Sequence, residues 1–384
     1  MSKSDKVKRM RAALKHKEYD RIPIGDFFWT GFMNKAKAKW GDDFDPYKHF
    51  DLDYIVINPN MDPHVKDFEI LEQKGEDILV KTGFEATVRR SGQAPMPHFD
   101  AFSVEQPDDM AGFAFDDDDI MSRFDRAGDD QLNCLGDTLV RNIPSWNERV
   151  DAYKDDFCVF GSICEMYEFV WRIVGTENVL YWIALEPEKF KAFVDRAADF
   201  MQKVLEAQIE AGKGKLDGMY IWGDVAYVNG MMFSPDMWRE VFKPHVERYI
   251  KTCHDAGLMV VYHGCGDARA IYDDFVQIGL DAYNPLEAKA HLDVVEIQKT
   301  YKNAMGFVGN IDVRELESGD KDRIKKELLY KIRAGSGGGW VCQSDHSVSS
   351  DVEPESYEYM VELLKEYGTQ PLDMKRIDAE LAKL

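Results

Sequence analysis

The sequence contains no apolar run that approaches the roughly 20 residues of a membrane-spanning helix. Its start, MSKSDKVKRMRAALKHKEYD, is charged where a secretory signal would need an apolar core. Positive charge is also scarce, because 48 lysines and arginines against 70 acidic residues give a formal net charge of −22. A surface for nucleic acid or an anionic membrane would need a basic patch. We therefore expect a cytoplasmic protein that binds neither nucleic acid nor membranes.

Cysteine is sparse as well. Six cysteines scattered over 384 residues do not form a disulfide framework, and a reducing compartment would leave their thiols free to bind a metal. Length and a hydrophobic content of 45% allow a substantial buried core. We expect one domain spanning residues 1–384, with an insertion at about 60–150.

Short apolar runs alternate with helical patterns from Cys158 onward, as in repeated β/α units around a parallel sheet. One such pattern, PEKFKAFVDRAADFMQKVLEAQIEAG, has apolar positions three and four apart and ends in glycine, which predicts an amphipathic helix over 187–212. The predicted strands are 54–58, 158–162, 218–224, 259–263, 282–286, 305–309 and 340–343. An eighth is expected near Ile22. The predicted fold is therefore an α/β TIM (β/α)₈ barrel with an N-terminal extension and a hairpin insertion at 77–89.

The stretch MVVYHGCGD at 259–267 places His263 and Cys265 at the end of a predicted strand. Residues two apart in extended backbone point to the same face, so the imidazole and the thiol can aim at one point. Cys342 ends another strand-like run, 342 − 265 = 77 residues later. One imidazole and two thiolates suit zinc and leave a fourth position open. The alternative is a structural cysteine pair beside a hydrogen-bonded histidine.

More polar residues fall at or just beyond the C-terminal ends of predicted strands, which share one mouth in a barrel, where active sites form. We interpret three of them as candidate catalytic acids or bases, with helix capping or support of site residues as the alternative: Asp224, Asp345 and His346. Three others are candidate cofactor-binding residues: Asn284, Asn310 and Asp312. The glycine run 335–339 precedes a strand, so we expect it at the opposite end of the barrel.

An aromatic cluster follows the expected first strand: Phe27, Phe28, Trp29 and Phe32. These side chains are either ordinary core or a flat apolar wall for an aromatic ligand. The sequence leaves both interpretations open.

The order of several motifs resembles the uroporphyrinogen decarboxylase superfamily, strongly from about Asp217 onward. The motifs are DRIP at 20–23, WGD at 222–224, SPDMWREVFKPH from Ser234, YHGCGD, GLDAYNP from Gly279, GNID from Gly309, and GGGW followed by SDHSVSSDVEPES. True decarboxylases of this superfamily carry an arginine-rich RQAGR segment soon after the first strand, to hold the carboxylates of the porphyrinogen. Here that region reads DFFWTGFMNKAK, without arginine. An apolar wall cannot pair with many carboxylates.

The His-x-Cys motif and the distant cysteine are similar instead to the zinc-binding pattern of the corrinoid-dependent methyltransferases in this superfamily. That resemblance implies a TIM barrel with zinc at its mouth, held by His263, Cys265 and Cys342, beneath a docked partner protein that carries a corrinoid (B12) cofactor. Zinc can hold a thiol as thiolate or stabilise a departing phenolate. We therefore expect a zinc-dependent methyltransferase that moves a methyl group between a small substrate and the cobalt of the corrinoid protein.

Other functions stay open at this point. The aromatic cluster favours a methoxylated aromatic or another methyl donor, as in O-demethylation, over methylation of a thiol of the coenzyme M type. A decarboxylase or lyase of the superfamily and a non-catalytic corrinoid- or tetrapyrrole-binding protein are the further alternatives.

Overall fold

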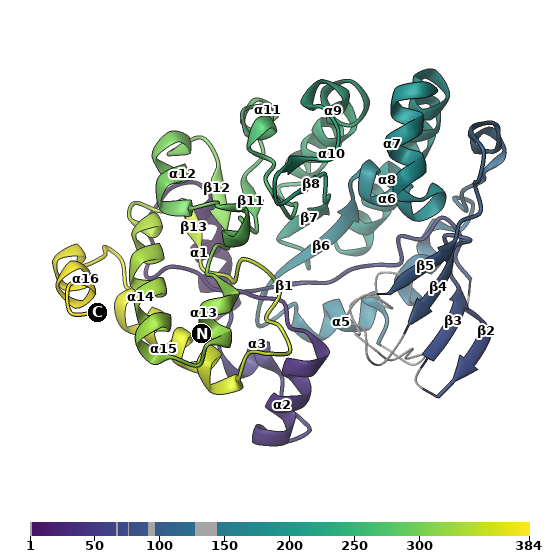
Figure 1. Cartoon of the computed structure of the whole chain (residues 1–384). Helices are drawn as coiled ribbons and strands as arrows, with labels where there is room; N and C mark the ends of the chain where they lie inside the picture. Colours follow the sequence, from purple (N-terminus) through teal and green to yellow (C-terminus); the bar gives the residue numbers. More distant parts are fainter. Residues whose placement is uncertain (1, 67, 76, 91–96, 127–143) are drawn as a thin grey trace.

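The computed structural model describes residues 2–66, 68–75, 77–90, 97–126 and 144–384. Seven parallel strands form its central sheet, and their order in the sheet follows the order of the chain (Figure 1). The strands are β1 (Tyr54–Val56), β6 (Cys158–Cys164), β7 (Gly218–Trp222), β10 (Met259–His263), β11 (Ala282–Asn284), β12 (Gly306–Val308) and β13 (Trp340–Val341). Each coincides with a predicted strand, and each neighbouring pair is parallel.

Helices connect these strands, as the alternating pattern predicts. The helix expected at 187–212 is α8, which ends just before Gly212. Residues 235–255 form two successive helices, because Pro244 in the first turn of the second cannot continue a helix from the residues before it. The connecting and C-terminal helices are α6 (Met166–Val174), α7 (Thr176–Leu185), α8 (Pro187–Ala211), α9 (Pro235–Val241), α10 (Lys243–Asp255), α11 (Tyr272–Gln277), α12 (Val294–Tyr301), α13 (Val313–Glu317), α14 (Lys321–Lys331), α15 (Pro354–Tyr367) and α16 (Met374–Leu381). None of the helices in the described ranges is long and apolar enough to cross a bilayer.

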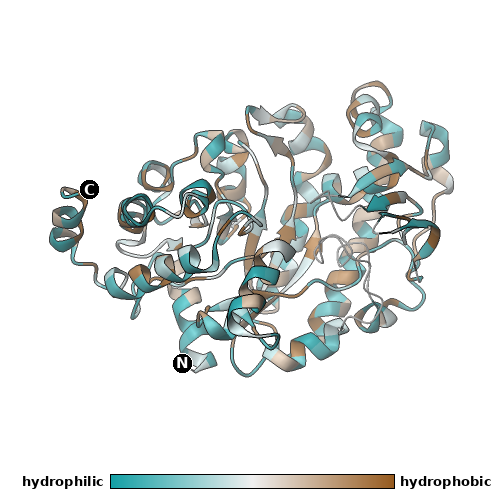
Figure 2. Ribbon diagram, turned by 60° about the horizontal axis from the view of Figure 1, so that its bottom comes forward, coloured by the Kyte–Doolittle hydropathy of each residue, from teal (hydrophilic) through white to brown (hydrophobic). Residues whose placement is uncertain are grey.

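The sheet has two buried faces. Alternate strand residues on its inner face form one cluster, and α1 (Lys3–Leu14) packs against it with Met10, Ala13 and Leu14. The other face packs against the helices in a larger cluster. In Figure 2, brown hydrophobic segments gather in the middle of the molecule, and the helix beside the C-terminus is largely teal. Because both faces of the sheet are packed with apolar side chains, polar side chains are expected mainly at the ends of the strands.

The segment around Ile24 runs beside both edge strands. The N–H of Cys342 donates to Pro23 O over 2.9 Å, and the N–H of Gly25 donates to Cys342 O over 3.2 Å. On the other side, the N–H of Asp53 donates to Ile24 O over 2.7 Å. Near Ile22, where the eighth strand was expected, the structure has a short bridging segment with isolated bridges rather than a strand, one of them a parallel bridge between Ile24 and Cys342.

Buried charges fasten the N-terminal extension. Asp53 is fully buried, pairs with Arg9, and lies 2.7 Å from Arg21 Nη1. Its Oδ2 also accepts the N–H of Ile24 over 2.8 Å. The N–H of Gly339, in the glycine run, donates to Ala13 O of α1, so this run lies at the end of the sheet that α1 covers.

The insertion contains an antiparallel sheet of four strands, in the order β2 (Glu69–Lys74), β3 (Asp77–Lys81), β4 (Thr87–Arg90) and β5 (His98–Ala101). The predicted hairpin at 77–89 is the β3–β4 pair. The described parts of the insertion also include the 3₁₀ helices η1 (Pro107–Gly112) and η2 (Ile120–Asp125) and the helix α5 (Trp146–Tyr153). Residues 91–96 and 127–143 of the predicted insertion lie outside the described residues.

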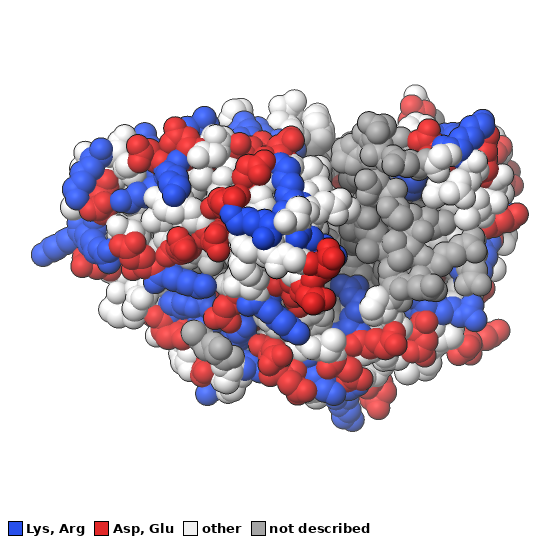
Figure 3. Space-filling model, turned by 90° about the horizontal axis from the view of Figure 1, so that it is seen from below, with Lys and Arg blue, Asp and Glu red and all other residues white. Residues whose placement is uncertain are grey.

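Acidic and basic side chains are interspersed on the described part of the face seen in Figure 3. Ion pairs among the described surface residues include Lys39 with Glu355 and Lys35 with Glu353. The described part of this face carries no extended basic patch, in keeping with the net charge of −22.

Candidate metal centre

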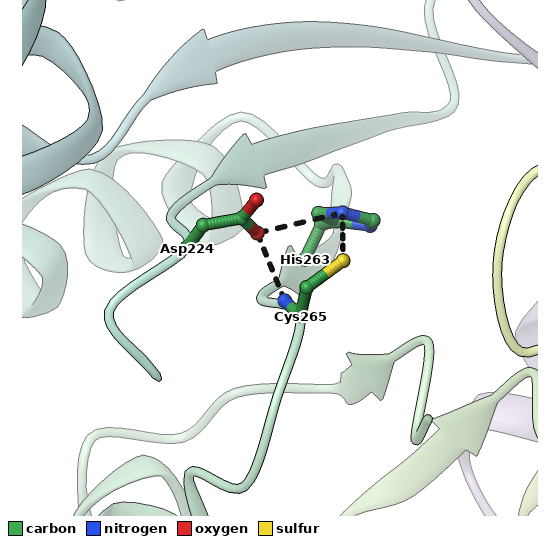
Figure 4. Close-up of side chains that lie close together, drawn as sticks. All are labelled: Asp224, His263 and Cys265. Carbon is green, nitrogen blue, oxygen red and sulfur yellow. Dashed lines mark hydrogen bonds and ion pairs between the residues drawn. The ribbon is translucent and has the colours of Figure 1, made fainter. Parts of the chain in front are cut away.

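Three side chains converge at the C-terminal ends of β7 and β10 (Figure 4). His263 Nε2 lies 3.7 Å from Cys265 Sγ and 3.7 Å from Asp224 Oδ1. The same Asp224 oxygen accepts the N–H of Cys265 over 2.8 Å. One ligand atom from each residue lies within 4.8 Å of the other two, a spacing at which the three could hold a metal ion. The structure therefore brings the predicted His263 and Cys265 together and adds Asp224.

A hydrogen-bonded chain fixes the tautomer of His263. Asn284 Nδ2 donates to Val308 O over 2.9 Å and to Gln343 Oε1 over 3.2 Å, which leaves Asn284 Oδ1 as an acceptor. His263 Nδ1 lies 2.6 Å from that oxygen and must carry the proton. Nε2 then presents its lone pair toward Cys265 and Asp224, the arrangement found in metal-binding histidines. Gln343 also accepts a hydrogen bond from Tyr54, so the chain extends across the inner face of the sheet.

Close backbone contacts hold the Cys265 turn (264–266). The N–H of Gly264 donates to Asn284 O over 2.8 Å. Gly266 has a φ of +81°, and a Cβ there would lie 2.6 Å from Tyr227 O in the hairpin of β8 (Ala226–Tyr227) and β9 (Gly230–Met231). The N–H of Gly266 donates to Glu287 Oε2 over 3.0 Å. The thiol is therefore set in a turn that tolerates little movement.

A second group of possible ligands shares the same thiol. Ligand atoms of Cys265, Glu287 and His346 also lie within 4.8 Å of one another. Glu287 is buried in the loop after β11 and pairs with Lys289 over 3.1 Å. His346 lies in the loop after β13, where its ring packs edge to face on Trp29 with 5.4 Å between ring centroids. Cys265 is thus the residue common to both groups.

Burial decides the protonation of the two ligands on β10 in the metal-free protein. It lowers the pKa of His263, against an opposing effect of the nearby Asp224 carboxylate. It raises the pKa of the Cys265 thiol, and the neighbouring Asp224 and Glu287 add to this rise. Both groups are therefore neutral near pH 7, so a cation would bind an imidazole lone pair and displace the proton of the thiol.

Cys342 lies apart from both groups. It is fully buried, and its Sγ is 3.9 Å from Met360 Sδ of α15. It packs in the cluster between the sheet and the helices, whereas its neighbour Val341 belongs to the inner cluster. Among the described residues, Cys342 belongs to no group of three possible ligands.

The predicted aromatic cluster divides into two pairs. Phe27 lies 5.5 Å from the ring of Trp222, which in turn lies 4.8 Å from the His263 ring. Trp29 contacts His346, as described above. Phe28 and Phe32 stack on each other at 5.2 Å within the large cluster between the sheet and the helices. Phe27 and Trp29 thus border the candidate metal centre through Trp222 and His346, and Phe28 and Phe32 are core.

The remaining predicted site residues hold loops. Asn310 Oδ1 accepts the N–H of Val294, and its Nδ2 donates to Leu286 O and Leu292 O. Asp312 caps α13 by accepting the N–H of Arg314. Asp345 accepts the N–H groups of Ala288 and Val313 over 2.8 and 2.9 Å, and burial raises its pKa to about 6. A direct role of Asn310, Asp312 or Asp345 in binding or catalysis stays a prediction.

Sequence analysis missed three residues near the centre: Trp222, Glu287 and Gln343. Trp222 is the last residue of β7, and its Nε1 donates to Asn58 Oδ1 over 3.2 Å. Its place at a strand end is a usable signal, because the same criterion identifies Asp224 two residues later. Glu287 follows β11 by three residues, in a loop whose course the sequence does not reveal.

The fold and the site define an α/β protein whose parallel strands direct possible metal ligands to one end. The uroporphyrinogen decarboxylase (URO-D) family model matches residues 160–367, more than half of the sequence. The chain therefore belongs to the uroporphyrinogen decarboxylase family, as its motifs predict.

Similar proteins carry two different names. A uroporphyrinogen decarboxylase of Thermus thermophilus is 27% identical over 180 residues, which are 45% of this chain and 47% of that protein. A methylated-thiol–coenzyme M methyltransferase of Methanosarcina mazei is 26% identical over 148 residues, which are 38% of this chain and 36% of that protein. The matched region thus spans about half or less of the length of these relatives. A solved methyltransferase from Methanosarcina mazei has a TM-score of 0.62 at 17% identity, over 94% of this chain and 98% of that one, and so shares the fold.

Proposed function

We propose that this protein is a zinc-dependent methyltransferase that moves a methyl group between a small substrate and the cobalt of a corrinoid carried by a partner protein. A methoxylated aromatic is the favoured methyl donor. The observation that carries the proposal is the convergence of His263 Nε2, Cys265 Sγ and Asp224 Oδ1 at the strand ends.

The residues fit a zinc ion. A thiol, an imidazole whose Nε2 lone pair faces it, and carboxylates are the ligand types that zinc takes in proteins. His263 and Cys265 lie at the end of β10. Asn284 supports the imidazole, and backbone hydrogen bonds hold the Cys265 turn. When bound, zinc supplies a Lewis acid that stabilises negative charge on a departing oxygen or holds a thiol as its thiolate.

Ether cleavage also requires a proton. When the bond between the methyl carbon and the ether oxygen breaks, the electron pair stays on the oxygen, which must be neutralised. Asp224 is the best placed of the predicted acids and bases, because its side chain is 44% exposed beside His263 and Cys265. Both carboxyl oxygens of Asp345, by contrast, accept backbone N–H groups. We therefore assign to Asp224 the transfer of a proton from solvent to the departing oxygen.

The surroundings support an aromatic substrate. Trp222 packs against His263 and Trp29 packs against His346, and Phe27 packs against Trp222. Such rings bind a flat apolar molecule by stacking and edge contacts. They supply no positive charge for a substrate with several carboxylates, which argues against decarboxylation of a tetrapyrrole.

A thiol methyltransferase is the second candidate, favoured by the similarity to the methylated-thiol–coenzyme M methyltransferase. The same cation would then hold the thiol acceptor as a thiolate. The two reactions would use the same metal centre. They would differ in the substrate that binds against Phe27, Trp29 and Trp222.

The proposal includes the architecture and the partner. We infer that the bridging segment at Pro23–Gly25 completes a (β/α)₈ barrel, because it hydrogen-bonds beside both β13 and β1. We also infer that residues 1–384 form one domain. The corrinoid protein would dock at the C-terminal ends of the strands, since cobalt must approach the substrate there.

Purified full-length protein would test the proposal with cob(I)alamin, offered methoxylated aromatics and thiols in separate reactions. We expect consumption of cob(I)alamin with a methoxylated aromatic and about one zinc per chain. Cys265→Ser should abolish both, whereas Cys253→Ser, which changes a buried cysteine in α10, should retain both. A metal-free native protein that is active, or one that releases carbon dioxide from a tetrapyrrole, would refute the proposal.

A further inference from the structure

We infer that the metal centre of this chain takes His346, and not Cys342, as the ligand that joins His263 and Cys265. The inference deepens the proposed function and depends on it for the presence of zinc. It replaces a two-thiolate site by a site with one thiolate and two imidazoles.

The register of the sheet separates Cys342 from the centre. Along a strand, residues two apart share a face, and neighbours face opposite sides. Met259 and Val261 belong to the inner cluster, and His263 continues their face at the end of β10. Val341 belongs to the same inner cluster, so Cys342 faces the helices instead.

The surroundings of Cys342 hold it on that side. Its thiol is fully buried beside Met360 of α15. Its backbone N–H donates to Pro23 O, and its backbone carbonyl accepts the N–H of Gly25. Turning the thiol inward would require the end of β13 to shift by one residue. That shift would break both backbone hydrogen bonds and move every neighbouring side chain to the other face.

His346 is suitably placed. A ligand nitrogen of its ring lies within 4.8 Å of Cys265 Sγ, and the ring is only half-buried. Within the described residues, no hydrogen bond occupies its ring nitrogens, and its position is set by packing on Trp29. Each imidazole thus has a nitrogen within 4.8 Å of the same sulfur, but the two belong to separate groups, so sharing one ion requires one ring to move toward the other.

The two nearby carboxylates are already engaged. Glu287 accepts the N–H of Gly266 with Oε2 and pairs with Lys289 through Oε1. Asp224 Oδ1 accepts the N–H of Cys265. Both therefore also position the Cys265 turn, and His346 is the remaining side chain of the two groups. Three protein ligands leave one coordination position open for substrate.

The ligand set also bears on the reaction. One thiolate offsets half of the charge of Zn²⁺, so the site keeps more Lewis acidity than one with two thiolates. Such a centre stabilises a departing phenolate better than it activates a thiol as nucleophile. The set therefore favours an ether donor over a thiol acceptor.

The test measures metal binding directly on purified full-length protein. Zinc content and zinc affinity against a competing chelator would be determined for the wild type, Cys342→Ser, His346→Ala and the control His254→Ala, which removes an exposed histidine of α10. Removing a group that only supports a ligand typically weakens metal binding about 10- to 100-fold, so we expect His346→Ala to weaken it at least about 100-fold. Cys342→Ser and His254→Ala should stay within about threefold of the wild type.

Cobalt substitution gives a second readout that is independent of turnover. The thiolate-to-metal absorption of the Co²⁺ protein should have the intensity of one thiolate, remain in Cys342→Ser and vanish in Cys265→Ser. Urea unfolding would show that each variant is folded. Loss of metal from folded Cys342→Ser, or retention of metal by His346→Ala, would overturn the inference and leave the proposed function standing. A wild-type protein that binds no zinc would refute the proposed function, and the inference with it.

Discussion

The Cys265 turn gives the most direct test of how the site is built. Replacing Gly266 by alanine adds a Cβ at a φ of +81°, 2.6 to 2.7 Å from backbone atoms of Tyr227. The left-handed conformation alone costs a residue with a side chain about 1 to 2 kcal/mol. The clash with backbone that cannot rotate away adds about 1 to 3 kcal/mol, as in an overpacked core. We therefore expect Gly266→Ala to lower the free energy of unfolding by about 2 to 5 kcal/mol.

Gly279 provides a matched control. It has the same φ of +81°, and a Cβ there would meet nothing within 4 Å. Gly279→Ala should therefore cost only the conformational part, about 1 to 2 kcal/mol. The difference between the two variants isolates the contact of the Cys265 turn with the β8–β9 hairpin.

Urea unfolding and zinc content measure the two consequences separately. Relief of the clash must displace the Cys265 turn, so Gly266→Ala should also lose zinc, while Gly279→Ala keeps it. Equal destabilisation of the two variants together with full zinc in both would show that the turn is not held against the hairpin, and the reasoning would be wrong.

Two further predictions concern buried carboxyl groups. Asp53→Asn removes a fully buried carboxylate that pairs with both Arg9 and Arg21, and should lower the free energy of unfolding by about 3 to 5 kcal/mol in urea. Asp236→Asn, at a pair whose carboxylate is 92% exposed, should change it by less than about 1 kcal/mol, and similar effects of the two substitutions would contradict this account. Burial raises the pKa of Asp26 to about 7, although Ser344 donates two hydrogen bonds to it. Because the folded protein then holds a proton that the unfolded chain releases, the free energy of unfolding should fall as the pH rises from about 4 to about 7, by up to about 4 kcal/mol. Asp26→Asn should lack this part of the pH dependence. If the free energy of unfolding depends on pH identically in the variant and the wild type, Asp26 is not the source of the effect.

The order of the strands was predictable because each is an apolar run followed by a helical pattern. The positions of Asp224, His263 and Cys265 followed from the same pattern, since a parallel sheet brings its C-terminal strand ends together. The four-stranded antiparallel sheet was only partly predictable. Its β3–β4 hairpin has an alternating pattern, but the exposed β2 and β5 have no apolar face to reveal them.

The sequence did not predict whether a given side chain at a strand end points to the inner face of the sheet or to the helices. The sequence places Cys342 at the tip of a strand, but β13 ends at Val341, and the next residue faces the helices. An error of one residue in the register exchanges the two faces. The aromatic cluster divides for a similar reason, because α2 (Thr30–Trp40) begins directly after Trp29 and turns Phe32 into the core.

Residues at the strand ends of this fold differ in how their hydrogen-bonding groups are used. Asn310, Asp312 and Asp345 all lie at strand ends, yet their polar atoms bind backbone groups of the adjacent loops. His263 differs, because its one hydrogen bond to Asn284 leaves Nε2 directed at a thiol. Loops that carry a metal centre must themselves be fixed, since a displacement of about 1 Å is costly in catalysis. Polar residues at one end of the sheet thus differ in their contacts: some bind the backbone of the loops, and His263 presents a free ring nitrogen to the proposed metal centre.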